Sequence, residues 1–258
     1  MSRILITGAS GGLGAALAAA YSQPGNDLFL MGRDRPRLKA CADDCSSRGA
    51  RTTLADFDIR DLERLKAEIE KVQDEGPLDL AIFNAGVGGV SSIDRAVESI
   101  DRVQEVVEVN LLAPLIGATL VADPMAMVNG GRIVLIGSVA GQFPLPIAPS
   151  YSASKAGLAM FAEALRLRLR KHHVAVTLVS PGFIDTAMSR GLPTPRPFLI
   201  SAEKAAAIIK REIDAGRSHV VLPWQFRLIG RISALLPSWA IGAILVRSHE
   251  VALRKLSD

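Results

Sequence analysis

The sequence predicts a single-domain α/β fold in which about seven parallel strands form a doubly wound sheet with helices on both faces. Short apolar segments alternate with longer amphipathic ones along the 258 residues, a pattern typical of strands joined by helical crossovers. The hydrophobic fraction of 49% and the mean hydropathy of +0.27 fit strands that are buried on both faces. This length suffices for one large core.

The predicted strands are apolar segments at 3–6, 28–31, 52–55, 79–83, 132–137, 174–179 and 219–222. Helical patterns fill the intervals between them. We place the main domain at 1–223 and an apolar and basic helical extension of it at 224–258. Ligands of such sheets bind at the carboxyl ends of the strands, so the residues that follow each strand are candidate site residues.

A glycine-rich turn follows the first predicted strand. It reads Thr7-Gly-Ala-Ser-Gly-Gly-Leu-Gly14 and leads directly into an alanine-rich helix. Glycines let backbone N–H groups approach a pyrophosphate, and the helix N-terminus favours its negative charge. The spacing of Gly8, Gly12 and Gly14 differs from the commoner G-x-G-x-x-G, but its place between strand and helix predicts a Rossmann-type dinucleotide site. The alternative is that the glycines only permit a tight turn.

The end of the second strand bears on the choice between NAD and NADP. An acidic residue there would bind the ribose hydroxyls and repel a 2′-phosphate, but this chain has Gly32 and Arg33. A guanidinium is a good partner for phosphate, so we expect NADP(H) to be favoured over NAD(H). A solvated surface charge is the alternative for Arg33. We expect Asp34 to cap the helix that begins near Pro36.

The third and fourth strands are also followed by candidate cofactor contacts. Asp58 could accept a hydrogen bond from an adenine amino group. The segment Asn84-Ala85-Gly86 allows a close approach of the backbone to the cofactor. Turn formation is the alternative explanation for both.

Tyr151 and Lys155 are four residues apart in Tyr-Ser-Ala-Ser-Lys, so a helix would place them side by side. A cation close to a tyrosine favours the phenolate and lowers the pKa of the phenol toward neutrality, which would make the pair an acid–base catalyst. The spacing alone also fits an exposed lysine stem lying along a half-buried ring.

The order of these motifs resembles the short-chain dehydrogenase/reductase family, in its compact single-domain branch. The resemblance covers about residues 3–222 and rests on Thr7-Gly-x3-Gly-x-Gly14, Asp58, Asn84-Ala-Gly86, Asn110, Ser138, Tyr151-x3-Lys155, Pro181-Gly182 and Thr186. Finding all of these motifs together in the family's order is more specific evidence than any single motif. Phe83 is a departure, because many relatives carry a second asparagine there; at a strand end it should not remove a catalytic group.

The resemblance implies an oxidoreductase that transfers a hydride between NADP(H) and a carbonyl or secondary alcohol. Tyr151 would donate a proton to the carbonyl oxygen, Lys155 would lower the pKa of Tyr151 and hold the nicotinamide ribose, and Ser138 would orient the substrate oxygen. Asn110 would hold a water that links Lys155 to solvent. The implied cofactor contacts also include Ser10, Leu13, Ile59, Pro181, Gly182, Ile184 and Thr186.

The expected pocket wall is apolar and consists of Val139, Phe143, Leu145, Ile147, Phe183, Met188 and Leu192. It favours a hydrophobic or lipid-like ketone over a small charged acid. The proline-rich segment 192–198 is a candidate lid, and the only charges expected near the wall are Arg190 and Arg196. Ordinary core or oligomer contact is the alternative role of the wall.

The run 232–246 carries no charge and is flanked by Arg227, Arg231 and Arg247. It contains Pro237 and is shorter than the roughly 20 residues of a spanning helix. We expect it to contact a sister subunit of a homodimer or homotetramer, or to cap the pocket. The alternative is weak membrane-surface association through Trp239, which would fit a lipid or envelope-glycan precursor as substrate. The N-terminus shows no secretory pattern, so we expect a cytoplasmic protein, peripheral to the inner face of a membrane in the second case.

Other classes are disfavoured by composition. The net charge of +4 is scattered along the chain and aromatic residues make up only 5%, so we expect no nucleic-acid partner. Cys41 and Cys45 should be reduced thiols, and the four histidines do not suggest a metal site. Two functions remain as alternatives: a non-catalytic NADP(H)-binding sensor or scaffold, which would not need the acid–base pair, and a nucleotide-sugar lyase or epimerase, whose larger substrate domain this chain cannot accommodate.

Overall fold

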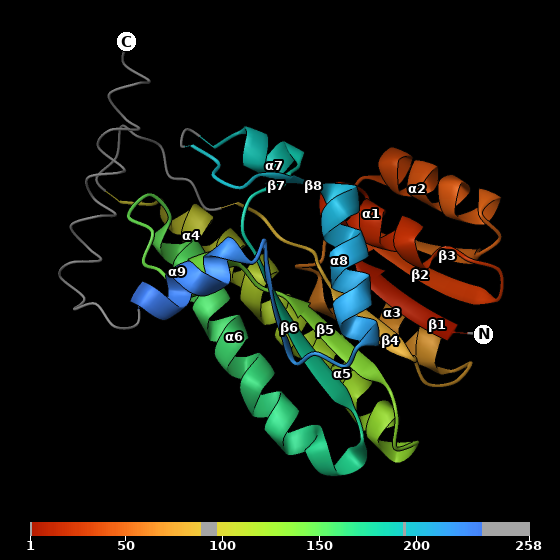
Figure 1. Ribbon diagram of the computed structural model, residues 1–258. Coiled ribbons are helices and arrows are strands. Elements are labelled where there is room, and N and C mark those ends of the chain that lie inside the picture. Colours follow the sequence, from red (N-terminus) through yellow and green to blue (C-terminus); the bar gives the residue numbers. More distant parts are fainter. Residues whose placement is uncertain (1, 89–96, 193–194, 234–258) are drawn as a thin grey trace.

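The computed structural model describes residues 2–88, 97–192 and 195–233. Seven parallel strands form one sheet in the order β3-β2-β1-β4-β5-β6-β9 (Figure 1). They are β1 (Ser2–Thr7), β2 (Asn26–Gly32), β3 (Arg51–Asp56), β4 (Leu80–Phe83), β5 (Arg132–Ile136), β6 (Ala175–Pro181) and β9 (His219–Leu222). Each overlaps a segment predicted from the sequence, so the doubly wound parallel sheet is confirmed.

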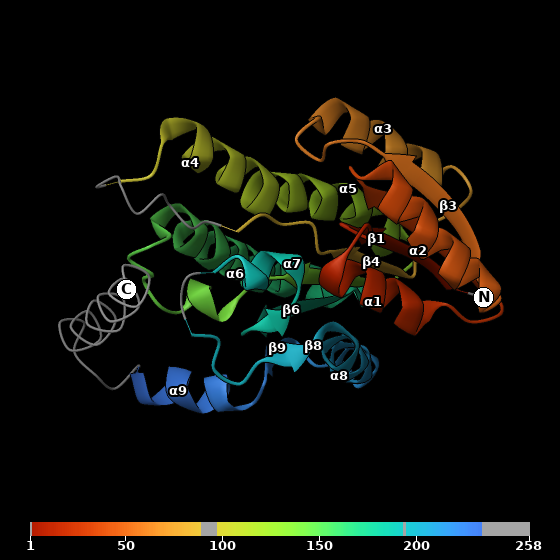
Figure 2. The ribbon, with the colours of Figure 1, turned by 90° about the horizontal axis from the view of Figure 1, so that it is seen from above.

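Helices cover both faces of this sheet (Figure 2). One face packs against α1 (Gly12–Tyr21), α2 (Arg35–Ser47) and α8 (Ala202–Asp214), and the other against α3 (Leu62–Gln73), α5 (Ala113–Met127) and α6 (Pro149–Leu169). Along β5, Val134 and Ile136 pack into the first layer, whereas Ile133 and Leu135 pack into the second. Successive side chains of a strand point to opposite faces, so a strand between two helical layers must be apolar throughout.

Asp34 caps α2 as the sequence predicted. Its carboxylate accepts a 3.1 Å hydrogen bond from the backbone N–H of Arg37, and Pro36 lies in the first turn. Cys41 and Cys45 are free thiols on the same helix. Within the described parts of the chain, no three potential metal-ligating side chains converge.

A long helical run precedes β5. It comprises α4 (Ile100–Val107), a π-helical turn (Glu108–Leu112) and α5, which together span 28 residues. The run is long and apolar enough to cross a membrane, but half of its most apolar window is buried in the fold, as in a core helix. This run also carries a predicted site residue, because Asn110 lies in its π-helical turn.

Several short elements at the carboxyl edge of the sheet were not predicted. They are β7 (Ile184–Asp185), α7 (Ala187–Arg190), β8 (Ile200–Ser201) and a 3₁₀ turn at Val139–Gly141. A second unpredicted 3₁₀ turn, Arg170–His172, connects α6 to the start of β6 at the opposite, amino edge. The last described element is α9 (Gln225–Ser233). From the uncharged run 232–246, α9 contains only Ile232 and Ser233. The predictions made for Trp239 and the rest of the run therefore concern residues outside the described part of the chain.

Candidate active site

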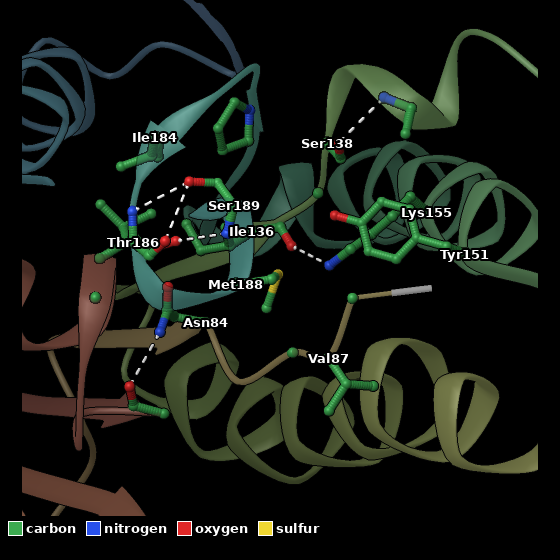
Figure 3. A pocket seen from close by; sticks show the side chains of 18 of the residues that line it. Asn84, Val87, Ile136, Ser138, Tyr151, Lys155, Ile184, Thr186, Met188 and Ser189 are labelled. Atoms are coloured by element: carbon green, nitrogen blue, oxygen red, sulfur yellow. Dashed lines mark hydrogen bonds between the residues drawn. The ribbon is translucent and has the colours of Figure 1, made fainter. Parts of the chain in front are cut away.

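A cavity of about 1330 Å³ lies at the carboxyl ends of the strands, where the strand order changes direction between β1 and β4. It brings together most of the residues predicted for the cofactor and for catalysis (Figure 3). They are Gly8, Ser10, Gly12, Leu13, Arg33, Asp58, Ile59, Asn84, Ala85, Gly86, Ser138, Tyr151, Lys155, Pro181, Gly182, Ile184 and Thr186. Three other predicted residues, Thr7, Gly14 and Asn110, are not in its lining and lie behind it.

The glycine turn has a backbone that only glycine tolerates well. Gly8 and Gly12 adopt positive φ angles of 69° and 53°. At Gly14 a Cβ would overlap the carbonyl oxygen of Gly8, so the first turn of α1 can close against the strand end only without a side chain there. Gly11, in contrast, has nothing within 4 Å of the place where its Cβ would be.

Thr7 and Asn84 tie this turn to the end of β4. The backbone N–H groups of Asn84 and Ala85 donate to Thr7 Oγ1 over 3.0 and 3.1 Å. The Asn84 amide donates in turn to the carbonyl oxygens of Thr7 and Gly8, at 3.1 and 3.3 Å. These bonds hold the two strand ends together, so Thr7 contributes to the site through Asn84 and Ala85.

Asn110 is completely buried and supports the segment that follows Gly86. Its Oδ1 accepts from the backbone N–H of Val87 at 2.8 Å, and its Nδ2 donates to the Val87 carbonyl oxygen at 3.0 Å. A Cβ on Gly86 would lie 3.2 Å from Asn110 Oδ1 and 3.9 Å from Lys155 Nζ. Asn110 and Lys155 therefore both border the space beside Gly86, and the Asn110 amide is bound to Val87. The water expected at Asn110 stays a prediction.

Ser138, Tyr151 and Lys155 meet at one end of the cavity (Figure 3). Lys155 is buried, and its Nζ donates a 2.9 Å hydrogen bond to the carbonyl oxygen of Ile136 at the end of β5. The same Nζ lies 5.7 Å from the centroid of the Tyr151 ring. Ser138 Oγ accepts from the backbone N–H of Ala140 over 3.1 Å, so its own proton can be donated to an oxygen in the cavity, that of Tyr151 or of a substrate.

Burial dominates the electrostatics of this cluster. It raises the pKa of the Tyr151 phenol, and a hydrogen bond with Ser138 opposes that rise. Burial also lowers the pKa of Lys155 to about 8. The sequence suggested that Lys155 would lower the pKa of Tyr151, but here the opposing contribution comes from Ser138, and the lysine ammonium is directed at the Ile136 carbonyl.

The lowered pKa of Lys155 should appear in the pH dependence of stability. The folded protein loses this proton near pH 8, whereas the unfolded chain keeps it to near pH 10.5, so the residue makes the free energy of unfolding rise with pH across this window. Lys155→Met should remove that contribution. Urea unfolding of both proteins at several pH values measures it; parallel stability curves would rule out a strongly lowered lysine pKa.

The end of the cavity near the glycine turn carries several charges. Arg33 is exposed there, and Asp58 is paired with Arg60, whose Nη2 lies 2.7 Å from Asp58 Oδ2. The hydrogen bond from Arg60 is the main cause of the lowered pKa of Asp58, with a smaller contribution from Arg33. A Cβ at Gly32 would lie 2.9 Å from Ser10 Oγ, so a larger residue at position 32 would displace the Ser10 hydroxyl.

The other end of the cavity is apolar. All seven residues of the predicted wall line it, namely Val139, Phe143, Leu145, Ile147, Phe183, Met188 and Leu192. Sequence reasoning missed Phe226, Ile229 and Ile232, which α9 contributes to the same wall. Their spacing of three residues, which places them on one helix face, is the signal that could have identified them.

The two arginines expected near this wall are turned toward Asp185. Arg190 Nε lies 2.8 Å and Arg196 Nη1 lies 3.9 Å from Asp185 Oδ1, and none of the three lines the cavity. Phe83, the departure noted in the sequence, is buried and packs against Gly117 away from the cavity, so it removes no group from the site.

Comparisons with known proteins agree with this architecture. The family model for short chain dehydrogenases matches residues 2–196. An uncharacterized oxidoreductase of Myxococcus xanthus is 33% identical over 235 residues, which cover 91% of this chain and 92% of that protein. A ketoacyl reductase of Nostoc sp. is 32% identical over 244 residues, or 89% and 84% of the two chains.

Two solved structures show the same fold. A short-chain dehydrogenase from Sphingobium yanoikuyae in complex with NADPH aligns with a TM-score of 0.80 at 24% identity, covering 91% of this chain and 95% of that one. A bulky-bulky ketone specific alcohol dehydrogenase from Comamonas testosteroni aligns with a TM-score of 0.77 at 24% identity, covering 92% and 95%.

Proposed function

Because the chain belongs to the short-chain dehydrogenase/reductase family, we propose that it is an oxidoreductase that transfers a hydride between NADP(H) and a bulky apolar ketone or the corresponding secondary alcohol. The observation that carries the proposal is the convergence of Ser138, Tyr151 and Lys155 at one end of the cavity whose other end is the glycine turn. A sensor or scaffold would have no physical need of this cluster.

The residues at the glycine turn fit a dinucleotide. Gly8, Gly12 and Gly14 leave a cradle that side chains would fill, beside the N-terminus of α1. This cradle would hold the pyrophosphate, Arg33 and Ser10 the 2′-phosphate, and Lys155 the nicotinamide ribose. The segment from Pro181 to Thr186 would cover the nicotinamide, which supplies or accepts the hydride when bound.

The chain's own contribution to catalysis is proton transfer and orientation. Burial keeps the pKa of the Tyr151 phenol raised, so the hydroxyl is protonated at neutral pH and can donate to a carbonyl oxygen during reduction. The Ser138 hydroxyl donates a second hydrogen bond to the same oxygen and fixes the carbonyl for attack. In the reverse direction Tyr151 accepts the proton of the alcohol.

Arg33 should discriminate between the two nicotinamide cofactors. Arg33→Ala should weaken NADPH binding by about tenfold or more, because a hydrogen-bonded charge is lost, and should change NADH binding by less than about twofold. Arg35→Ala is the matched control: Arg35 is exposed at the first position of α2 and does not line the cavity. Fluorescence titration measures the affinities; equal affinity of the parent protein for NADH and NADPH would contradict the proposed preference.

The substrate class is supported by the wall opposite the glycine turn. It is apolar, and the nearby arginines are paired with Asp185. Lys155 is the only cation among the described lining residues of this end, and its ammonium is directed at the Ile136 carbonyl, so the wall favours an apolar ketone over a charged keto acid. A screen of ketones and alcohols that follows NADPH absorbance tests the proposal. We expect bulky apolar ketones to be reduced faster than small keto acids; a protein active only on the acids would exclude this substrate class.

A further inference from the structure

A carboxylate from a distant part of the chain holds the residue next to Tyr151. Glu98 lies just before α4, and its Oε2 accepts a 2.8 Å hydrogen bond from the backbone N–H of Ser150. Its Oε1 accepts a second, 2.7 Å bond from the Ser150 hydroxyl. Ser150 is buried and directly precedes the tyrosine. Both oxygens of the Glu98 carboxylate therefore accept hydrogen bonds from a single residue of α6.

The start of α6 has no cap of its own. Ala148 occupies the N-cap position without a side-chain hydrogen bond, and the first turn contains no acidic residue. Free N–H groups at a helix start need acceptors, and a negative charge there is favourable. Glu98 supplies both from 52 residues away in the sequence. Tyr151 belongs to this first turn, so the carboxylate fixes the part of the helix that carries the proton donor.

Glu98 is anchored by the helix that follows it. The next residue, Ser99, caps α4 through a 3.3 Å bond from the backbone N–H of Arg102 to its hydroxyl. This helix continues into the turn that holds Asn110, which fixes Val87. On the other side of the same first turn, Ser152 Oγ accepts a 3.1 Å bond from the backbone N–H of Leu145 in the apolar wall. The turn is thus held from two sides, by Glu98 and by the wall.

We propose that Glu98 is a positioning residue for Tyr151, which keeps the phenol in place for proton transfer by capping α6 through Ser150. The effect of Glu98 on turnover rests on the proposed reductase function, whereas its effect on the phenol does not. Glu98 touches neither the cavity lining nor the reacting atoms and acts only through the first turn of α6.

Kinetic measurements provide the first test. Glu98→Ala should lower kcat for ketone reduction by about tenfold, because a small displacement of the proton donor suffices for such a loss. NADPH affinity should stay within about twofold, since the glycine turn and Arg33 lie at the other end of the cavity. Glu98→Gln should recover most of kcat, because the amide oxygen can still accept from the Ser150 N–H. Asp101→Ala, an exposed carboxylate on the first turn of α4, should behave like the parent.

A spectroscopic measurement tests the same point without turnover. The chain has only two tyrosines, so the titration of Tyr151 can be isolated by subtracting the tyrosinate absorbance of Tyr151→Phe. Burial raises the pKa of the phenol, so loosening of the first turn in Glu98→Ala should admit water and lower that pKa toward its ordinary value of 10.0.

The two measurements separate the possible failures. A parent protein that reduces no ketone would refute the proposed function, and the tyrosine titration would still decide the role of Glu98. An unchanged tyrosine titration in Glu98→Ala, or a variant with parental kcat, would overturn the positioning role. A loss of kcat that is matched by losses of NADPH affinity and melting temperature, with no recovery in Glu98→Gln, would also overturn it, because it would indicate a general loss of structure.

Discussion

Tyr151→Phe should lower kcat for ketone reduction by about a thousandfold, within the range expected when a general acid is removed. The ring that lies beside Lys155 stays in place, and only the hydroxyl at the Ser138 end of the cavity is lost. NADPH binding should therefore change by less than about twofold. Steady-state kinetics and a binding titration measure the two effects separately.

Tyr21→Phe is the matched control for this substitution. Tyr21 is the other tyrosine of the chain; it is buried in α1, and its hydroxyl has no hydrogen-bond partner among the described residues. Removing that hydroxyl should leave kcat unchanged. If Tyr151→Phe reduced ketones as fast as the parent protein, the assignment of Tyr151 as proton donor would be wrong.

Gly14→Ala should abolish cofactor binding. The new Cβ would overlap the Gly8 carbonyl oxygen, and this backbone atom cannot move without opening the turn that would hold the pyrophosphate. We expect NADPH affinity to fall by at least about a hundredfold and the free energy of unfolding to fall by about 1–3 kcal/mol, as in other overpacked sites. Calorimetric titration and urea unfolding measure the two quantities.

Gly11→Ala adds the same methyl group three residues earlier, where the structure leaves space. Gly11 has an extended φ of 175°, and nothing lies within 4 Å of the added atom, so cofactor affinity and stability should stay near those of the parent. Equal behaviour of the two alanine variants would show that the turn does not need the close approach seen at Gly14.

The strands and the residues that follow them could be predicted because their signals are local. Runs such as Ile133-Val-Leu-Ile136 are apolar throughout since both faces of the sheet are covered, and the glycine turn and the Tyr151–Lys155 spacing are visible within a few residues. Such signals predicted many of the residues that surround the cavity, but not Phe226, Ile229 and Ile232 of α9. They did not predict that Thr7, Gly14 and Asn110 lie behind the lining of the cavity, because the distance of a residue from the cavity is set by tertiary packing.

The parts that were missed depend on contacts between distant segments. The strands at Ile184–Asp185 and Ile200–Ser201 are too short to have a periodicity, and they pair with each other although they are distant in the sequence. The bond between Glu98 and Ser150 joins residues with no local pattern. The pKa of Tyr151 was expected to be lowered by its neighbour, but burial, which a sequence does not reveal, raises it.

The most direct test of the proposed reaction is transfer of deuterium from cofactor to product. The parent protein would be incubated with a bulky apolar ketone and with NADPH deuterated at C4, on each face in turn, and the alcohol examined by mass spectrometry. Hydride transfer in this site predicts one deuterium per alcohol from one of the two labelled cofactors and none from the other. An alcohol that is formed without deuterium from either cofactor, or the absence of any alcohol across a broad set of such ketones, would contradict the proposed function.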